Sequence, residues 1–358
     1  MSRAPKPLAI PAGGFREIAI LRLSSLGDVV LTLPVVHALR AAFPDARIHY
    51  WVKEEYAEAL SADPAIDHVR MLERDGRRLE DLVSMSAELE ACDLIVDLHA
   101  SSRTRVLTFR QGAPVLRVRN QRLLRSRWVH ARWTGPRPAD PVVERYARTL
   151  APLGIEAAEA PRLTVGPEVE RWAADWCAAR GAAPRIGFCP AAQHATKRWP
   201  EEHWLSLLEL QLARGRRVVA FSLPREREQF PRLLSAIESQ SSAGWCSEKL
   251  QRQAALMSRL DAVVCGDTGL MHVAAARGAR VVAMFGSTSP ALGFAPAGGG
   301  HIVLCRNEPC QPCTLHGRER CPLGHFHCMK KLLPGEVEAA VEDVLAGAPA
   351  RAGGPVSN

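Results

Sequence analysis

The sequence repeats one pattern along most of its length: a short apolar run rich in β-branched residues, followed by a stretch of helical periodicity. This alternation is typical of βα units, which build a parallel sheet covered by helices. In the first half of the chain, strands are predicted at 17–23, 47–52, 68–72, 93–98 and 115–119. The pattern then restarts, with strands predicted at 185–189, 217–221, 261–265, 280–285 and 301–305. We therefore predict an α/β protein with two Rossmann-like, doubly wound domains.

The interruption of this pattern locates the domain boundary. Gly154, Pro161 and Gly166 punctuate a small, polar stretch between two helical segments. We expect one domain over 15–160 and a second over 161–348. Proteins of this class bind ligands at the carboxyl ends of the strands, and a two-domain chain is expected to place its ligand cleft between the domains.

Size and charge limit the functions that need to be considered. The chain has 358 residues, 47% of them hydrophobic, which fits two folded domains and excludes a disordered protein. The formal net charge of +8 is smaller than expected of a dedicated nucleic-acid binder. The chain has no apolar run of signal-peptide or membrane-span length, so we expect a cytoplasmic protein.

A polar loop follows the first predicted strand and precedes a helix. It reads Ser24-Ser25-Leu26-Gly27-Asp28. Backbone N–H groups at the start of a helix attract anions, so this loop is a candidate ligand site with Asp28 at its rim. The alternative is that Asp28 caps the helix, a role that Asp often fills.

Three further loops of the second half have similar character. Gly266 and Gly269 permit close approach of the backbone to a ligand, while Asp267, Thr268 and His272 add polar groups. Asp267 could equally be a helix cap. The loop after the strand at 185–189 carries Lys197 and Arg198, which suit a diphosphate, and residues 286–290 add hydroxyl groups. Neither GxxxxGK[ST] nor GxGxxG is present, so ordinary P-loop and dinucleotide sites lack support.

These loops, taken in order, resemble the ADP-heptose:lipopolysaccharide heptosyltransferases, glycosyltransferase family 9. The resemblance spans residues 17 to 345. It is carried by Ser24–Asp28 with Thr32-Leu33-Pro34, Lys197-Arg198-Trp199-Pro200, Asp267-Thr268-Gly269 with His272, and Phe285-Gly286-Ser287-Thr288-Ser289-Pro290.

The resemblance implies a GT-B fold in which the first domain binds the acceptor and the second binds the nucleotide sugar. It implies that Asp28 is the general base and that transfer inverts the anomeric carbon by a single displacement. Lys197 would stabilise the leaving diphosphate together with Thr196, Thr268 and Gly269. No catalytic metal or other cofactor is required.

The resemblance also implies further contacts with the donor and the acceptor. Asp267 and His272 belong to the expected donor site. An acidic residue is expected to hold the ribose, and here Glu226 and Glu228 are the candidates, with Glu228 favoured by its spacing. In the acceptor loop the expected residues are Ser24, Ser25 and Gly27.

Four cysteines near the C-terminus form a second candidate site. Cys310, Cys313, Cys321 and Cys328 lie within 19 residues. A CxxC pair with two further thiols is the kind of ligand set that holds tetrahedral Zn or Fe, here in a structural role within a cysteine-rich loop at 305–328. Some heptosyltransferases carry a comparable cysteine-rich finger at this place. Reduced thiols or a disulfide pair in a surface loop are the alternative.

An arginine-rich stretch runs from Arg103 to Arg137 with ten arginines. A solvated basic face is the ordinary explanation. The functional one is that residues such as Arg103 and Arg105 bind a phosphorylated acceptor of the lipid A–Kdo type, with peripheral, electrostatic contact to the inner membrane.

The sequence therefore predicts an inverting glycosyltransferase that moves L-glycero-D-manno-heptose from ADP-heptose to the Kdo or heptose of the lipopolysaccharide inner core. A first alternative is a transferase of the same fold with another nucleotide sugar or a protein acceptor. An alternative of another class is a metal-finger nucleic-acid-binding protein, although no nucleic-acid partner is expected.

Overall fold

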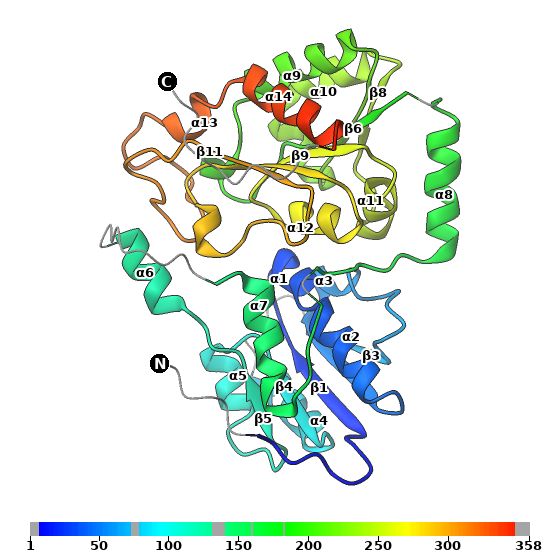
Figure 1. Ribbon diagram of the computed structural model, residues 1–358, viewed down its shortest axis with the longest axis vertical. Helices are drawn as coiled ribbons and strands as arrows, with labels where there is room; N and C mark the ends of the chain where they lie inside the picture. The colour runs from blue at the N-terminus through cyan, green and yellow to red at the C-terminus, as the bar shows by residue number, and fades with distance from the viewer. Residues whose placement is uncertain (1–6, 73–78, 131–139, 159, 182, 348–358) are drawn as a thin grey trace. The chain divides into compact units, whose positions relative to one another are not determined.

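The computed structural model describes residues 7–72, 79–130, 140–158, 160–181 and 183–347. It separates into two compact units, one of residues 1–120 and 142–164 and the other of residues 121–141 and 165–358. Each unit is built on its own parallel sheet (Figure 1). The α/β fold class with two Rossmann-like sheets is confirmed, whereas the domain limits 15–160 and 161–348 stay a prediction.

The sheet of the first unit has the strand order β3-β2-β1-β4-β5. Its strands are β1 (Glu17–Leu21), β2 (Arg47–Lys53), β3 (His68–Leu72), β4 (Leu94–Asp97) and β5 (Val115–Arg117). On one face, Ala19 and Leu21 pack with Met85 and Leu89 of α4 (Leu79–Glu90). Because the chain leaves β1 in one direction and β4 extends the sheet in the other, the order reverses between β1 and β4.

The sheet of the second unit has the order β11-β10-β9-β6-β7-β8. Its strands are β6 (Arg185–Cys189), β7 (Arg217–Phe221), β8 (Ala243–Cys246), β9 (Ala262–Gly266), β10 (Val281–Phe285) and β11 (Ile302–Cys305). Here the order reverses between β6 and β9. Alternate strand residues such as Phe188 and Val264 face a core shared with α9 (Glu201–Ala213), α10 (Pro231–Glu238) and α14 (Pro334–Leu345).

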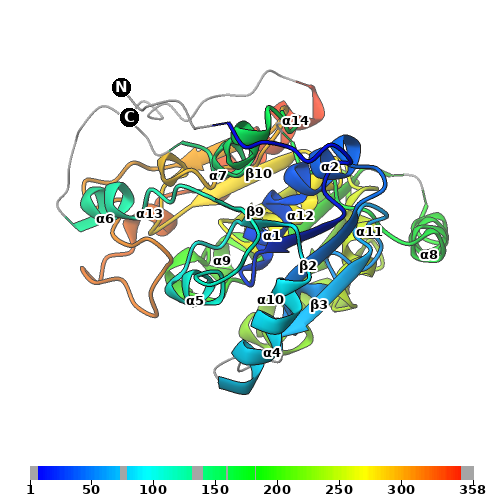
Figure 2. The same cartoon turned by 90° about the horizontal axis from the view of Figure 1, so that it is seen from below.

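Helices layer both faces of each sheet, as Figures 1 and 2 show. Those of the first unit are α1 (Leu26–Leu31), α2 (Leu33–Ala42), α3 (Glu54–Ala57), α4, α5 (Ser102–Leu107) and α7 (Val142–Ala147). Those of the second are α6 (Arg122–His130), α8 (Pro167–Ala178), α9 (Glu201–Ala213), α10 (Pro231–Glu238), α11 (Leu250–Met257), α12 (Gly269–Ala276), α13 (His327–Lys330) and α14 (Pro334–Leu345). In the part of the chain that the structure describes, no helix has the length and apolar character needed to cross a bilayer.

Two elements differ from the prediction. The strand β8 was not predicted, because Ala243-Gly244-Trp245-Cys246 is short and lacks the alternation and β-branched residues typical of a strand. The periodicity of residues 226–238 predicts a single helix, whereas the structure has a 3₁₀ helix, η3 (Pro224–Gln229), followed by α10, which begins at Pro231. Proline favours the first turn of a helix and disfavours helical continuation before it, so a new helix starts at Pro231.

Candidate active site

Except for Glu228, which lies in η3 after β7, the predicted catalytic and donor residues lie in or directly after loops at the two positions where the strand order reverses. In the first unit these loops follow β1 and β4, and in the second they follow β6 and β9. At such a position neighbouring loops turn to opposite faces of the sheet and leave a crevice at the carboxyl ends of the strands. The topology therefore favours these two crevices as ligand sites.

The carboxylate of Asp28 is held by three donors. Its Oδ2 atom accepts a hydrogen bond from Ser25 Oγ at 3.1 Å and forms an ion pair with the guanidinium of Arg22 at 2.5 Å. Its Oδ1 atom accepts a hydrogen bond from the Tyr146 hydroxyl at 2.8 Å. The side chain remains 14% exposed. These donors stabilise the ionised carboxylate and fix its orientation, while its exposed part stays accessible to a substrate hydroxyl.

Asp28 is therefore not the helix cap that the alternative interpretation assumed. The N-cap of α1 is Ser25, and Asp28 occupies the first turn. Gly27 is buried in the same turn, and Ser24 is half-buried before it. The loop thus uses its polar side chains to hold Asp28 in place.

Arg22 and Tyr146 are the residues that the sequence analysis missed. Arg22 donates to the carbonyl oxygen of Leu98 at 2.9 Å, so it links the loop after β1 to the loop after β4. Its guanidinium lies 5.5 Å from the ring centroid of Tyr146. The charge directly after a strand was a usable signal for Arg22. Tyr146 is 118 residues from Asp28 on α7, and no local pattern could have indicated it.

The loop after β4 is shaped by a buried carboxylate. Asp97 Oδ1 accepts hydrogen bonds from the backbone N–H groups of His99 and Ala100 at 3.1 and 2.8 Å, while Oδ2 pairs with Arg117 at 2.7 Å. Ala100 has a φ of +49°, a conformation that is rare for a residue with a Cβ atom. The loop therefore holds His99 at the strand end, next to the carbonyl that binds Arg22.

His99 has two properties of interest at this place. Its Nδ1 atom is buried and has no hydrogen-bond partner among the described residues. Burial, reinforced by the positive charge of Arg22, lowers the pKa of His99 to about 4. The imidazole is thus neutral at pH 7 and retains capacity to hydrogen-bond a ligand. Of the predicted acceptor residues, Arg103 and Arg105 follow on α5, half-buried and exposed respectively.

In the second unit, Lys197 and Asp267 form an ion pair across the position where the strand order reverses. Lys197 Nζ lies 2.8 Å from Asp267 Oδ2, and the hydroxyl of Thr288 donates to the same oxygen at 2.8 Å. The three residues come from the loops after β6, β9 and β10. The structure therefore brings together the three loops that the sequence analysis singled out.

Thr196 joins these loops to the cysteine-rich segment. Its hydroxyl is within 2.9 Å of Ser287 Oγ and accepts a hydrogen bond from the backbone N–H of Arg318 at 2.8 Å. Its own backbone N–H donates to the Arg318 carbonyl at 3.0 Å. Thr196 is buried, so its side chain positions loops, and its contribution to a phosphate site would come from this placement.

The start of α12 presents polar groups for an anion. Thr268 is the N-cap residue, so the alternative that Asp267 caps this helix is not supported. The Thr268 hydroxyl is buried and has no hydrogen-bond partner in the described residues. Gly269 opens the helix and His272 is buried in it. A buried, unpaired hydroxyl beside helix N–H groups is favourable for a phosphate.

The two ribose candidates differ in their present contacts. Glu226 accepts a hydrogen bond from the backbone N–H of Leu223 at 3.0 Å and so caps η3. Glu228 is exposed on the same turn. Because Glu226 already has a capping role, this geometry favours Glu228 as the ligand-binding residue.

The four cysteines of the predicted metal site line one small cavity together with Thr196, Ser287 and His325. All four carry reduced thiols, and Cys310 Sγ lies 3.9 Å from His325 Nε2. Burial, together with the neighbouring thiols, raises the pKa of Cys328 to about 12. No group of three or more such side chains in the described ranges has metal-binding geometry, so the predicted metal is not confirmed. The residue types themselves, four thiols beside one cavity, are ligands that Zn and Fe bind.

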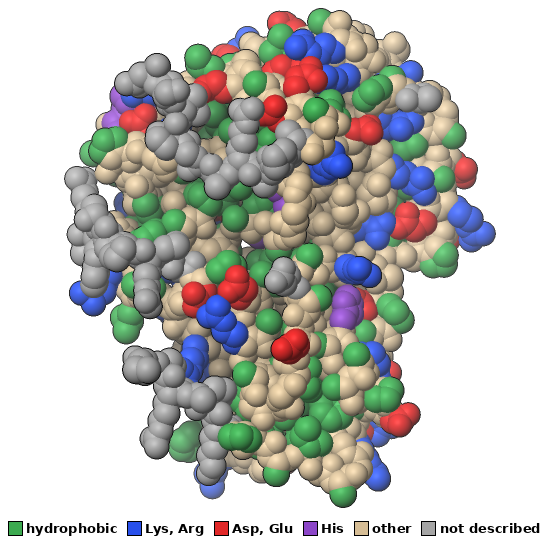
Figure 3. All heavy atoms as spheres, viewed as in Figure 1, with side chains coloured by type: hydrophobic (Ala, Val, Ile, Leu, Met, Phe, Trp, Pro, Cys, Tyr) green, Lys and Arg blue, Asp and Glu red, His purple; other side chains and the backbone are tan. Residues whose placement is uncertain are grey.

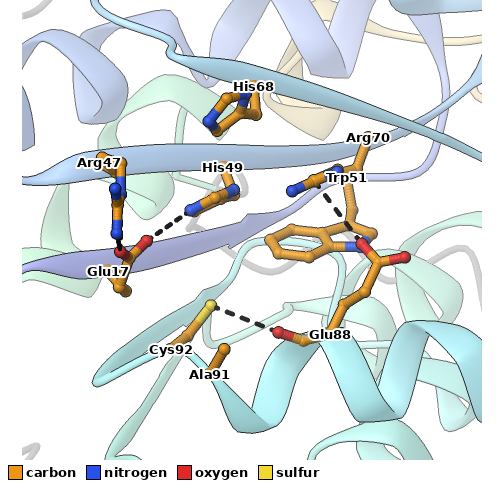
Figure 4. Close-up of a pocket in the computed structure, with 9 residues that line it drawn as sticks. All are labelled: Glu17, Arg47, His49, Trp51, His68, Arg70, Glu88, Ala91 and Cys92. Carbon is orange, nitrogen blue, oxygen red and sulfur yellow. Dashed lines mark hydrogen bonds and ion pairs between the residues drawn. The ribbon is translucent and has the colours of Figure 1, made fainter.

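A further cavity lies away from these loops. It measures about 360 Å³ and lies at the amino ends of β1–β3, beside α4 (Figure 4). Glu17 binds Arg47 and His49 there, and the ring of His49 stacks on that of His68. These contacts pair its charged groups with one another, and the cavity contains none of the predicted site residues.

Comparison with known proteins gives a family match. The model of glycosyltransferase family 9 (heptosyltransferase) matches residues 83–325. The lipopolysaccharide heptosyltransferase 2 of Salmonella typhimurium is 37% identical over 113 residues, which are 30% of this chain and only 32% of that protein's length. The lipopolysaccharide heptosyltransferase 1 of Pseudomonas aeruginosa is 27% identical, and the match covers 83% of this chain and 86% of that protein.

A solved structure shows the same fold. The ADP-heptose lipopolysaccharide heptosyltransferase II of Escherichia coli superposes with a TM-score of 0.68 at 22% identity, covering 92% of this chain and 98% of that one. The likeness extends over both units. The GT-B class predicted from the sequence is thereby confirmed.

Proposed function

Because this chain belongs to glycosyltransferase family 9, the heptosyltransferase family, we propose that it transfers L-glycero-D-manno-heptose from ADP-heptose to the lipopolysaccharide inner core, with inversion. The observation that carries the proposal is the carboxylate of Asp28, ordered by Arg22, Ser25 and Tyr146 at the carboxyl end of β1. A general base needs such an orientation toward the hydroxyl that it deprotonates.

In the proposed reaction, Asp28 accepts the proton of an acceptor hydroxyl as its oxygen attacks the anomeric carbon. ADP leaves from the opposite face, so a single displacement inverts that carbon. The developing negative charge on the leaving diphosphate needs fixed positive groups. Lys197, now paired with Asp267, would bind it together with Thr268 and the N–H groups that begin α12. The chemistry uses no metal or other cofactor.

The donor site would be completed by Glu228, His272 and Gly269, with the exposed carboxylate of Glu228 accepting hydrogen bonds from the ribose hydroxyls. On the acceptor side, Arg103 and Arg105 would bind phosphate or carboxylate groups of a lipid A–Kdo or inner-core acceptor. Such an acceptor is anchored in a membrane, so we also propose that the enzyme acts on the cytoplasmic face of the inner membrane, in peripheral contact with it.

The cysteine cluster is proposed as a structural Zn or Fe site. Cys310, Cys313, Cys321 and Cys328 would supply four thiolates, and the ion would tether a loop with little apolar core. What supports this is that the four thiols line one small cavity. Elemental analysis of the purified protein tests it: about one equivalent of Zn or Fe is expected, and a Cys313→Ser variant should lose it.

The proposed function is tested by separating binding from turnover. Asp28→Asn should retain ADP affinity and lose turnover by about 10²–10⁴-fold, since only the transition state uses the base. Lys197→Met should weaken ADP binding and slow the reaction together. Asp45→Asn, an exposed residue of the same unit, is the matched control and should leave both unchanged. Near-normal turnover by Asp28→Asn would overturn the assignment of the base.

The nucleotide that the protein binds distinguishes an ADP-heptose donor from another nucleotide-sugar donor. Calorimetric titration with ADP, UDP and GDP should show binding of ADP above the others if the donor is ADP-heptose. A preference for UDP or GDP would support a transferase of the same fold with another donor. Family membership leaves the metal-finger nucleic-acid-binding alternative without support.

A further inference from the structure

The positive charge of this chain is concentrated in one segment. Residues 98–139 contain ten arginines and no Asp, Glu or Lys. Outside this segment, the remaining 36 basic residues are outnumbered by 38 acidic ones, so the rest of the chain carries a formal charge of −2. The whole excess of +8 therefore comes from this arginine segment.

Elsewhere, many basic side chains are paired with acidic ones. Arg214 and Arg216 form a network with Glu338 and Glu342 on α14, and Figure 3 shows acidic and basic side chains interspersed over the face in view. Interspersed positive and negative charges produce little long-range electrostatic field. A segment whose charged side chains are all positive does produce such a field, and it attracts a negatively charged surface.

The same segment carries the most exposed large apolar side chains of the described residues. These are Phe109 at 83% exposure, Leu123 at 82% and Val106 at 72%. Val106 and Phe109 lie three residues apart, on α5 and just after it, and Leu123 lies on α6 of the other unit. Strongly exposed apolar groups amid arginines mark a contact surface more than a solvated face.

Contacts within and beneath α5 determine that Val106 and Phe109 face solvent. Ser101 caps the helix by accepting a hydrogen bond from the Thr104 backbone N–H at 3.2 Å. On the inner side Thr104 and Leu107 are buried, and the buried Thr108 hydroxyl donates to the Thr104 carbonyl at 2.7 Å. These contacts fix which side faces the core, so Val106 and Phe109 point outward together.

The arginines of α5 flank this apolar pair. Arg105 and Arg110 are exposed immediately beside Val106 and Phe109, and Arg103 is half-buried one turn before Val106. Apolar side chains at the centre with cations around them match a bilayer interface, where acyl chains lie beneath anionic head groups.

We propose that Val106 and Phe109 insert into an anionic membrane surface while Arg110 and its neighbouring arginines contact lipid phosphates. This changes the purely electrostatic contact expected from the sequence, because part of the binding is apolar and insensitive to salt. The choice of a membrane as the occupant rests on the proposed function, whose acceptor is a lipid. RNA fits less well, since Phe109 is the one ring of this pair and Val106 offers none on which a base could stack.

Vesicle sedimentation tests this surface on the full-length protein. The probes are vesicles of phosphatidylcholine with and without phosphatidylglycerol, at low and high NaCl. The wild type should bind only the anionic vesicles and should retain part of that binding at high salt. Val106→Ser with Phe109→Ser should reduce binding about tenfold or more and abolish the salt-resistant part. Arg110→Glu should reduce the salt-sensitive part.

The matched control is Met71→Ser, which removes another exposed apolar side chain of the same unit, 63% exposed on β3. It should bind vesicles as the wild type does. Because Val106 and Phe109 are exposed, the double variant should also keep the thermal midpoint of the wild type.

Activity separates this proposal from the proposed function. The double variant should keep normal turnover on a water-soluble, delipidated acceptor and lose turnover on the same acceptor embedded in anionic vesicles. Unchanged vesicle binding by the double variant would overturn the docking surface, as would wild-type binding to RNA and not to vesicles. Vesicle binding without turnover on either acceptor would refute the proposed function and leave the docking surface standing.

Discussion

Single residues in this protein act through partners that lie far away in sequence. Asp28 is oriented by Tyr146 from α7 and by Arg22, which also reaches the loop after β4. Lys197 is held by Asp267, 70 positions further along the chain. Each of these side chains has a small number of strong polar contacts, so single substitutions should have separable effects on chemistry, binding and stability.

Tyr146→Phe should slow the reaction without weakening donor binding. A hydrogen bond to a charged group contributes about 1.5–3 kcal/mol, and each 1.4 kcal/mol corresponds to about tenfold in rate. We therefore expect kcat to fall about ten- to hundredfold, because the carboxylate of Asp28 loses the donor to Oδ1. ADP affinity, measured by calorimetry, should not change.

The matched control is Tyr50→Phe, which removes a buried hydroxyl that bonds to Thr32 Oγ1 at 2.6 Å. Both variants lose one buried hydroxyl, but only the hydroxyl of Tyr146 contacts Asp28. Equal kcat values for the two variants would mean that Tyr146 has only a structural role.

Because the folded protein disfavours protonation of His99, its free energy of unfolding should decrease as the pH falls below 6.5. The pKa of His99 is lowered from 6.5 to about 4 in the folded protein, so between these values the unfolded chain binds the proton more readily. The contribution to the free energy of unfolding is therefore present above pH 6.5 and is lost as the pH falls toward 4. His99→Gln removes this titration, and its thermal midpoint should fall less than that of the wild type between pH 7 and pH 5.

The control is the exposed His68, as His68→Gln. This variant should follow the wild-type pH dependence of the thermal midpoint. If His99→Gln follows it too, the imidazole of His99 does not titrate in the way inferred.

At the scale of the elements, strand ends and helix starts are packed closely where the loops meet. A Cβ atom on Gly266, at the end of β9, would lie 2.8 Å from the carbonyl oxygen of Lys197. One on Gly286, after β10, would lie 2.8 Å from the carbonyl oxygen of Thr196. These two glycines allow the loops after β6, β9 and β10 to approach one another, which places Lys197 beside Asp267.

Gly266→Ala should therefore separate these loops. Backbone must move to relieve the contact, and such overpacking typically costs about 1–3 kcal/mol. We expect a lower thermal midpoint and an ADP affinity reduced about tenfold, measured by calorimetry. Gly299→Ala is the control, because a Cβ atom there meets nothing within 4 Å. An ADP affinity of Gly266→Ala equal to that of Gly299→Ala would contradict the importance of this close approach.

At the scale of the whole molecule, the proposed base and the proposed donor site belong to different units. Asp28 lies in the unit built on β1–β5, whereas Lys197, Asp267 and Thr268 lie in the unit built on β6–β11. Each unit has its own sheet and apolar core, so each can respond to its own ligand.

Hydrogen exchange with ADP tests this division of roles. ADP alone should slow amide exchange at 195–198 and 266–272, because a ligand stabilises the segments that it contacts. Exchange at 22–31, around Asp28, should stay unchanged. Protection that begins in the segment around Asp28 would place the nucleotide in the wrong unit and refute the assignment of the donor site.

Much of this protein could be predicted from the sequence alone. The alternation of apolar runs and helical periodicity determined the two parallel sheets, because burial on both faces of a strand and on one face of a helix is encoded locally. The loops carrying Asp28, Lys197 and Asp267 were identified in the same way, since ligand sites follow strand ends in this architecture.

The tertiary structure alone decided which side chains meet. The contact of Tyr146 with Asp28, the bridge from Arg22 to Leu98 and the junction of Thr196 with Arg318 join residues 76 to 122 positions apart. The strand β8 likewise exists because it pairs with β7, although its own residues do not favour a strand. Periodicity specifies conformation and burial along the chain. These contacts instead depend on which strands lie next to each other in the folded sheet, and distant parts of the sequence meet only there.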